Sequence, residues 1–151
     1  MKIALASDHA GFELKKDIAA YLANLGHTII DLGATTLDPQ DDYTNFIIPA
    51  ASQVAYGKAD RAVVIGGSGT GEAIGANRFP GVRAVVVNIE HPTTLDIVKL
   101  SREHNDANVI SFGARFVSAQ FVHTALDIWL STNFSNAERH SRRNNALDSI
   151  E

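Results

Sequence analysis

The chain has 151 residues, a length that fits one domain with a substantial buried core. Hydrophobic residues make up 45% of it and charged residues 20%, which is typical of a folded globular protein and excludes a disordered chain. The formal net charge of −4 argues against a general binder of nucleic acid or of membrane surfaces. No cysteine is present, which excludes disulfides, thiolate metal sites and cysteine nucleophiles. We expect no signal peptide and no membrane-spanning segment, and therefore a cytoplasmic protein.

Short apolar runs alternate along the chain with segments of helical periodicity. The expected strands cover residues 3–6, 28–32, 61–65, 82–87 and 109–112. Helices are expected from residue 12 to a stop at Gly26, and over residues 46–56 (with Pro49 near the first turn), 92–103, 118–131 and 135–150. Fully apolar strands separated by helices indicate a parallel sheet covered on both faces. We predict one domain over residues 1–151, a doubly wound α/β three-layer sandwich with a five-stranded parallel sheet and an extra C-terminal helix.

A glycine-rich loop, Gly66-Gly67-Ser68-Gly69-Thr70-Gly71-Glu72, follows the third strand and opens a helix. Glu72 excludes a Walker A loop and a dinucleotide loop, and Thr70 excludes a nucleophile elbow. The glycines let the main chain approach a ligand and present N–H groups to it. Because Glu72 would repel a bound anion, we interpret it as a base beside a site where negative charge develops during a reaction. The alternative is that Glu72 only occupies the first helical turn, where the helix dipole favours a carboxylate.

Two of the six histidines stand near strand ends with polar neighbours. His9 follows Asp8 at the end of the first strand, and His104 lies between a helix and the fifth strand. In an open α/β sheet the crevice outside the carboxyl ends of the strands is where ligands bind. No metal-binding spacing is present, so we predict no metal site. We assign packing or surface roles to His27, His91 and His123.

Three arginines are candidates for binding a phosphate group. Arg139 and Arg143 lie one helical turn apart and share a face, and Arg115 follows the fifth strand. Guanidinium groups that converge on one point bind phosphate by charge-assisted hydrogen bonds. Taken alone, the C-terminal segment is more typical of a solvent-exposed basic helix that pairs with the acidic surface. Arg142 lies one position off the shared face, and we assign it a structural role.

Eight short motifs occur in an order that resembles the type B ribose-5-phosphate isomerase family, which also contains galactose-6-phosphate isomerase subunits. They are Asp8-His9-Ala10-Gly11, Asp42-Tyr43, Gly66 to Glu72, Ala76-Asn77-Arg78, Gly81-Val82-Arg83-Ala84, Arg102-Glu103-His104-Asn105, Phe112-Gly113-Ala114-Arg115 and Arg139-His140-Ser141-Arg142-Arg143. The resemblance covers essentially the whole chain, and the combination is more specific than any single motif.

The resemblance implies an enzyme of the pentose phosphate pathway that interconverts ribose 5-phosphate and ribulose 5-phosphate through an enediolate, without a metal or other cofactor. It also implies a homodimer, or a tetramer of such dimers, whose active sites each draw residues from both subunits. Many members use a cysteine of the glycine loop as the base. Ser68 stands there in this chain, which therefore resembles the branch in which the loop glutamate, Glu72, moves the proton.

The same resemblance assigns roles to individual residues. Glu72 and His104 are catalytic, with His104 opening the sugar ring, and Asp8 and Asn105 hold sugar hydroxyl groups. Main-chain N–H groups of Gly67, Ser68, Gly69, Thr70 and Gly71 stabilise the enediolate oxygen. The phosphate is held by His9, Arg115, Arg139 and Arg143, and the remaining substrate-binding candidates are Tyr43 and His140.

Two departures from the family pattern leave the sugar open. Thr44 stands where the family usually has proline, and the segment Asn88–Leu100 is a few residues longer. Another aldose phosphate with four or six carbons, such as galactose 6-phosphate or allose 6-phosphate, is therefore an alternative substrate. A non-catalytic sugar-phosphate-binding module is the alternative from a different class, because a fold by itself implies no activity.

Overall fold

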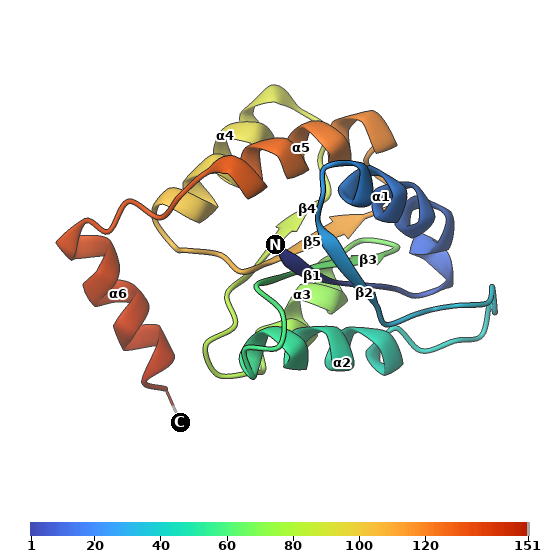
Figure 1. The fold of residues 1–151 in the computed structure, drawn as a ribbon, viewed down its shortest axis with the longest axis horizontal. Coiled ribbons are helices and arrows are strands. Elements are labelled where there is room, and N and C mark those ends of the chain that lie inside the picture. Colours follow the sequence, from blue (N-terminus) through green and yellow to red (C-terminus); the bar gives the residue numbers. More distant parts are fainter. Residues whose placement is uncertain (151) are drawn as a thin grey trace.

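The computed structural model describes residues 1–150, which are built around a five-stranded parallel sheet (Figure 1). The strands are β1 (Lys2–Ser7), β2 (Thr28–Asp31), β3 (Arg61–Gly66), β4 (Ala84–Val87) and β5 (Val109–Gly113), in the order β2-β1-β3-β5-β4. The inner strands β3 and β5 are buried throughout, whereas the edge strands β2 and β4 are partly exposed. The predicted fold class is confirmed. The predicted domain end at Glu151 lies outside the described residues.

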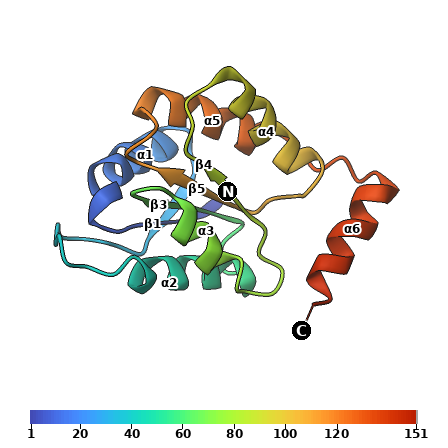
Figure 2. The same cartoon turned by 180° about the vertical axis from the view of Figure 1, so that it is seen from behind.

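Helices cover both faces of this sheet (Figures 1 and 2). A short 3₁₀ turn, η1 (His9–Gly11), leads into α1 (Phe12–Asn24), which shares one face with α4 (Pro92–Glu103) and α5 (Ala119–Ser131). The other face carries α2 (Thr44–Ala55) and α3 (Thr70–Ala76). Because α2 begins earlier than predicted, Pro49 lies inside this helix and not in its first turn. Among residues 1–150, no helix is both long and apolar enough to span a bilayer.

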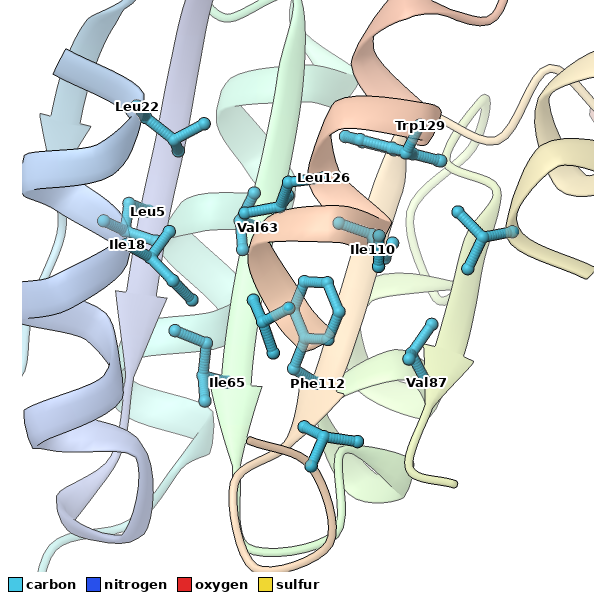
Figure 3. Packing of buried hydrophobic residues seen from close by; sticks show 14 of the residues in the cluster. Leu5, Ile18, Leu22, Val63, Ile65, Val87, Ile110, Phe112, Leu126 and Trp129 are labelled. Carbon is cyan, nitrogen blue, oxygen red and sulfur yellow. The ribbon is translucent and has the colours of Figure 1, made fainter. Parts of the chain in front are cut away.

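The two faces of the sheet are packed differently. Leu5, Val63, Ile110 and Phe112 point toward α1 and α5, where they meet Trp129 and other large side chains (Figure 3). Each fully buried side chain of this size stabilises the fold by about 1.5–3 kcal/mol. On the opposite face small side chains pack from both layers, Ala4, Ala6 and Ala62 from the sheet and Ala50 and Ala51 from α2. Small side chains let α2 approach the sheet closely.

The last helix, α6 (Glu138–Asp148), stands away from the body of the protein (Figures 1 and 2). It begins later than predicted because Asn136 has a positive φ of 53°, which is incompatible with a right-handed helix. Its far end is attached by Arg83, whose Nη1 donates to both carboxylate oxygens of Asp148 at 2.8 and 2.9 Å. A cleft of about 590 Å³ lies between α6 and the segment around Phe79 and Val82.

Candidate active site

The carboxyl ends of three neighbouring strands bring most of the predicted site to one edge of the sheet. β1 pairs with β3, and Gly66 at the end of β3 pairs with Gly113 at the end of β5. The segments that follow these strands therefore lie together, as predicted for a doubly wound fold. They are Asp8-His9, the glycine loop and Ala114-Arg115.

Hydrogen bonds from outside the glycine loop hold it in one conformation. Each carbonyl group from Gly66 to Gly69 accepts such a bond, and the donors are, in order, Ala114 N (2.8 Å), Arg115 N (3.2 Å), Asn88 Nδ2 (3.2 Å) and Ser111 Oγ (2.6 Å). Gly69 has a left-handed φ of 75°, and a Cβ atom there would lie 2.9 Å from the main chain of Phe112. The loop carbonyls are thus engaged, whereas the first N–H groups of α3 have no acceptor within the helix.

Glu72 is buried in the first turn of α3, with only 4% of its surface exposed. Its Oε2 atom has no hydrogen-bond partner, and its carboxylate lies directly against the Cα atom of Gly66. Burial raises the pKa of the Glu72 carboxyl, and the charge of Asp8 adds to this, while the main-chain N–H groups of Glu72 and Gly69 oppose it. A carboxylate in this environment is a stronger base than an exposed one.

Asp8 lies beside this carboxylate and caps the 3₁₀ turn that follows β1. Its Oδ1 accepts hydrogen bonds from the N–H groups of Ala10 at 3.0 Å and Gly11 at 3.3 Å. The side chain is buried, and Gly11 packs so closely that a Cβ atom there would lie 2.5 Å from Ile65. This packing fixes the position of Asp8 relative to β3 and the glycine loop.

Residues from three segments line the entrance to the glycine loop. The guanidinium group of Arg115 lies over Gly67, where a Cβ atom would be 3.2 Å from it, and the Tyr43 ring lies against Gly71, 3.1 Å from such an atom. His9 lies close enough to Arg115 for the positive charge of the arginine to oppose protonation of its ring and lower its pKa, although the Asp41 hydrogen bond outweighs this effect. Tyr43 and Arg115 therefore lie against the loop, and His9 lies near Arg115.

The remaining predicted residues lie at the opposite end of the sheet, beyond the amino ends of its strands. His104 follows α4 and precedes β5, so it stands beyond the amino end of that strand. Asn105 is next to it, where its carbonyl oxygen accepts from Arg83 Nε at 2.8 Å. Arg139 and Arg143 are exposed on α6, which is attached at this same end. Within one chain, the structure separates this second group from Glu72.

His140 has a different setting from that expected of a residue that binds substrate directly. It is buried, and its ring packs against His104 with 4.2 Å between ring centroids. Arg139 Nε donates to Nε2 at 3.0 Å, so Nδ1 carries the ring hydrogen and donates to Ser135 Oγ at 3.0 Å. Burial lowers the pKa of His140, and the charges of neighbouring residues lower it further. Both ring nitrogens are thus engaged within the chain.

Three residues near the glycine loop were not singled out from the sequence. Asn88 and Ser111 hold loop carbonyl groups, and Asp41 accepts from His9 Nδ1 at 2.6 Å. Asp41 belongs to a polar stretch whose composition predicts only a turn. No sequence spacing predicts its contact with His9, which lies 32 positions earlier.

Asp8, His9 and Asp41 each offer one potential metal ligand, and these atoms lie within 4.8 Å of one another. However, the 2.6 Å separation of His9 Nδ1 and Asp41 Oδ1 is that of a charge-assisted hydrogen bond. Two ligands held at about 2.0–2.1 Å around a tetrahedral metal would be roughly 3 Å apart. The pair is therefore arranged to share a proton.

A family model described as Ribose/Galactose Isomerase matches residues 3–147. The chain belongs to this family. It is 40% identical over 151 residues to ribose-5-phosphate isomerase B of Mycolicibacterium paratuberculosis, covering all of this chain and 92% of that protein. It is 39% identical over 150 residues to ribose-5-phosphate isomerase B of Escherichia coli K12, covering 99% of this chain and 96% of that protein.

Solved structures of the ribose/galactose isomerase family share the fold. Ribose-5-phosphate isomerase B of Clostridium thermocellum matches with a TM-score of 0.91 and 37% identity, covering 99% of this chain and 97% of that one. The enzyme of Mycoplasma genitalium with bound ribulose 5-phosphate matches with a TM-score of 0.90 and 33% identity, covering 97% of this chain and 93% of that one.

Proposed function

We propose that this chain is an aldose–ketose isomerase that interconverts ribose 5-phosphate and ribulose 5-phosphate, with residues 1–151 acting as one domain. Family membership supports the reaction class, and relatives named ribose-5-phosphate isomerase B support the substrate. The observation that carries the proposal is the buried carboxylate of Glu72, which has an unpartnered oxygen and lies against the glycine loop. A binding module for anions would have no use for a negative charge at this place.

Glu72 is the base that moves a proton between C2 of the aldose and C1 of the ketose. In the net reaction a hydrogen moves from C2 to C1, and another moves from the C2 hydroxyl group to the C1 oxygen. The intermediate is an enediolate, whose oxygen is stabilised by main-chain N–H groups of the loop from Gly67 to Gly71; each such donor contributes about 3 kcal/mol in other enzymes. Ser68 does not act as the base, because its Oγ accepts from Thr70 N at 3.3 Å and, within residues 1–150, forms no hydrogen bond with a histidine.

The phosphate is bound by positive groups at the entrance to the loop. Arg115 is exposed, and its guanidinium group lies over Gly67. No salt bridge within residues 1–150 involves Arg115, Arg139 or Arg143. In a chain with a net charge of −4, three exposed arginines without carboxylate partners favour an anionic ligand.

Two copies of the chain build each active site. His104, Asn105, Arg139 and Arg143 lie at the edge of the sheet opposite Glu72, so a site that uses all of them needs a second subunit. The position of α6, which stands away from the body of the protein, supports this arrangement, because a helix placed there can contact a neighbouring molecule (Figure 1). His140 contributes indirectly by packing on His104 and holding the Nε group of Arg139.

An exposed apolar surface on α2 and α3 supports a homodimer. Ile48 and Ile74 are 47% and 62% exposed, and a hollow of about 230 Å³ beside them is lined by Tyr43, Ile47 and Phe79. Apolar surface of this kind is typical of contacts between proteins. Because Tyr43 also touches Gly71, a subunit that covered this surface would lie next to the glycine loop. A tetramer would combine two such dimers.

The reaction uses neither a metal ion nor an organic cofactor. Main-chain amides of the glycine loop, Arg115 against Gly67, and His9 near Arg115 can stabilise the negative charge that develops on the substrate.

A six-carbon aldose phosphate is the second candidate substrate. The family description includes galactose, and the segment after β4 contacts the loop through Asn88, which donates to Ser68 O. Kinetic measurement of kcat/KM with ribose 5-phosphate, allose 6-phosphate and galactose 6-phosphate separates the candidates. We expect ribose 5-phosphate to give the highest value. A higher value for a hexose phosphate would assign that substrate, and no turnover of any sugar would favour a binding module.

A further inference from the structure

Asp41 uses one carboxylate oxygen to hold two groups of the same residue. Its Oδ1 accepts from the main-chain N–H group of His9 at 3.2 Å and lies 2.6 Å from the His9 ring Nδ1. The side chain of Asp41 is only 8% exposed, and its other oxygen, Oδ2, is buried without a hydrogen-bond partner. Within residues 1–150, the Asp41 carboxylate therefore forms hydrogen bonds only with His9.

This contact determines where the His9 ring carries its hydrogens. An amide N–H group can only donate, so Asp41 Oδ1 acts as an acceptor and His9 Nδ1 must be protonated. If the ring were neutral, Nε2 would then present a lone pair, which repels a phosphate oxygen. Only the doubly protonated ring donates from Nε2 and adds a positive charge.

The charged groups that face His9 mostly favour this doubly protonated form. The hydrogen bond to Asp41 raises the pKa of His9, and the charges of Asp8 and Asp41 add to it, whereas partial desolvation and the charge of Arg115 oppose it. The His9 side chain is 30% exposed, so Nε2 remains accessible. His9 and Arg115 thus present two positive groups to the same anion.

We propose that Asp41 is a positioning residue that keeps His9 doubly protonated and directs its Nε2 group at the phosphate of the substrate. The inference rests on the proposed function, since it takes the anion at His9 to be a sugar phosphate. Asp41 itself does not touch the substrate. It extends phosphate binding to a pH at which an ordinary histidine would be neutral.

The test is the Asp41→Asn substitution, which keeps the shape of the side chain and the Oδ1 acceptor but removes the charge. Because hydrogen bonds to charged groups are the strong ones, KM for ribose 5-phosphate should rise about tenfold over wild type at pH 8 and less than about twofold at pH 6. The kcat value should change less than about twofold at either pH, because Glu72 is untouched.

Asp38→Asn is the matched control from the same loop. Asp38 is exposed, and its Oδ1 accepts from Gln40 N at 2.9 Å, which asparagine can also do. This variant should behave as wild type at both pH values. Combining His9→Gln with Asp41→Asn gives a second control, because Asp41→Asn should have no further effect on KM once the imidazole is gone.

A measurement without turnover separates this inference from the proposed function. NMR titration of the His9 ring, with inorganic phosphate as the probe, should show a lower pKa and weaker phosphate binding at pH 8 in Asp41→Asn. An unchanged titration, or a lower pKa with unchanged phosphate binding and KM, would overturn the inference. If both change as expected but wild-type protein turns over no sugar phosphate, the inference stands and the isomerase proposal fails.

Discussion

The carboxylate of Glu72 fills the space in which a side chain at position 66 would begin: a Cβ atom on Gly66 would lie 1.8 Å from Glu72 Oε1. Gly66 ends β3, and Glu72 lies in the first turn of α3. The strand end and the helix start therefore form one unit, in which the absence of a side chain on Gly66 makes room for the base.

Gly66→Ala should displace the base without unfolding the protein. Gly66 lies in a strand with ordinary backbone angles, and a carboxylate at the end of a flexible side chain moves more easily than the main chain. A displacement of about 1 Å can lower a rate roughly a hundredfold, so we expect kcat to fall by about that factor. Steady-state kinetics and circular dichroism measure the two properties. Gly66→Ala combined with Glu72→Gln should be no slower than Glu72→Gln alone, and an additive loss would contradict this account.

Glu72→Gln should stabilise the protein at neutral and alkaline pH. The pKa of Glu72 is raised in the folded state, so the stability that this group contributes is present below its ordinary pKa and is lost as the pH rises through the folded value. Glutamine does not titrate. The Tm of the variant at pH 8 should exceed that of wild type by roughly 2–4 °C, as about 1 kcal/mol gives in a domain of this size.

Scanning calorimetry measures this difference in Tm between about pH 4.5, near the ordinary pKa of glutamate, and about pH 8. The difference should narrow toward the acidic end. Glu13→Gln is the control, because Glu13 is exposed on α1 and should show no such trend. A Glu72→Gln variant that is less stable than wild type at pH 8 would contradict the inferred cost of burying the carboxylate.

The sheet and its helices could be predicted because buried parallel strands and amphipathic helices leave clear periodic patterns. The strand order could not, since the apolar runs of β4 and β5 look alike; only the structure shows that β5 lies between β3 and β4. Pro49 was expected near the first turn of its helix because proline is favoured there, yet α2 begins at Thr44 and contains Pro49 in its interior.

The candidate site was predictable where it follows strand ends and glycine spacing, as for Asp8 and Glu72. The pairing of His9 with Asp41 joins a strand end to an irregular loop, and composition alone does not specify such contacts. His104 is instructive in another way. The sequence analysis grouped it with His9 as a residue near a strand end, but the structure places it beyond the amino end of β5, away from Glu72 within one chain.

Shared active sites predict that two inactive variants complement each other. A dimer that combines a Glu72→Gln subunit with an Arg139→Ala/Arg143→Ala subunit would contain one site with all residues intact. After purification through two different affinity tags, this mixed dimer should have about half of the wild-type activity, since one of its two symmetric sites is complete. Each variant alone should be nearly inactive. A mixed dimer as inactive as its parents would show that Glu72 and the α6 arginines do not share sites across subunits.

Activity should survive exhaustive treatment with a metal chelator. The groups proposed to stabilise the enediolate are main-chain amides and positive side chains, so no metal is needed to polarise the substrate. Isomerase activity after dialysis against a chelator should match that of untreated protein. A loss that Mg²⁺, Mn²⁺ or Zn²⁺ restores would contradict this prediction and direct attention to Asp8, His9 and Asp41.

The most direct test of the central claim follows the hydrogen at C2 of the substrate. Ribose 5-phosphate carrying deuterium at C2 is incubated with wild-type protein and with Glu72→Gln, and NMR records the label. Wild-type protein should remove deuterium from C2 as ribulose 5-phosphate forms, whereas Glu72→Gln should leave it in place while the sugar phosphate still raises the Tm of the variant. Removal of the label by Glu72→Gln at a rate near that of wild type would contradict the assignment of Glu72 as the base.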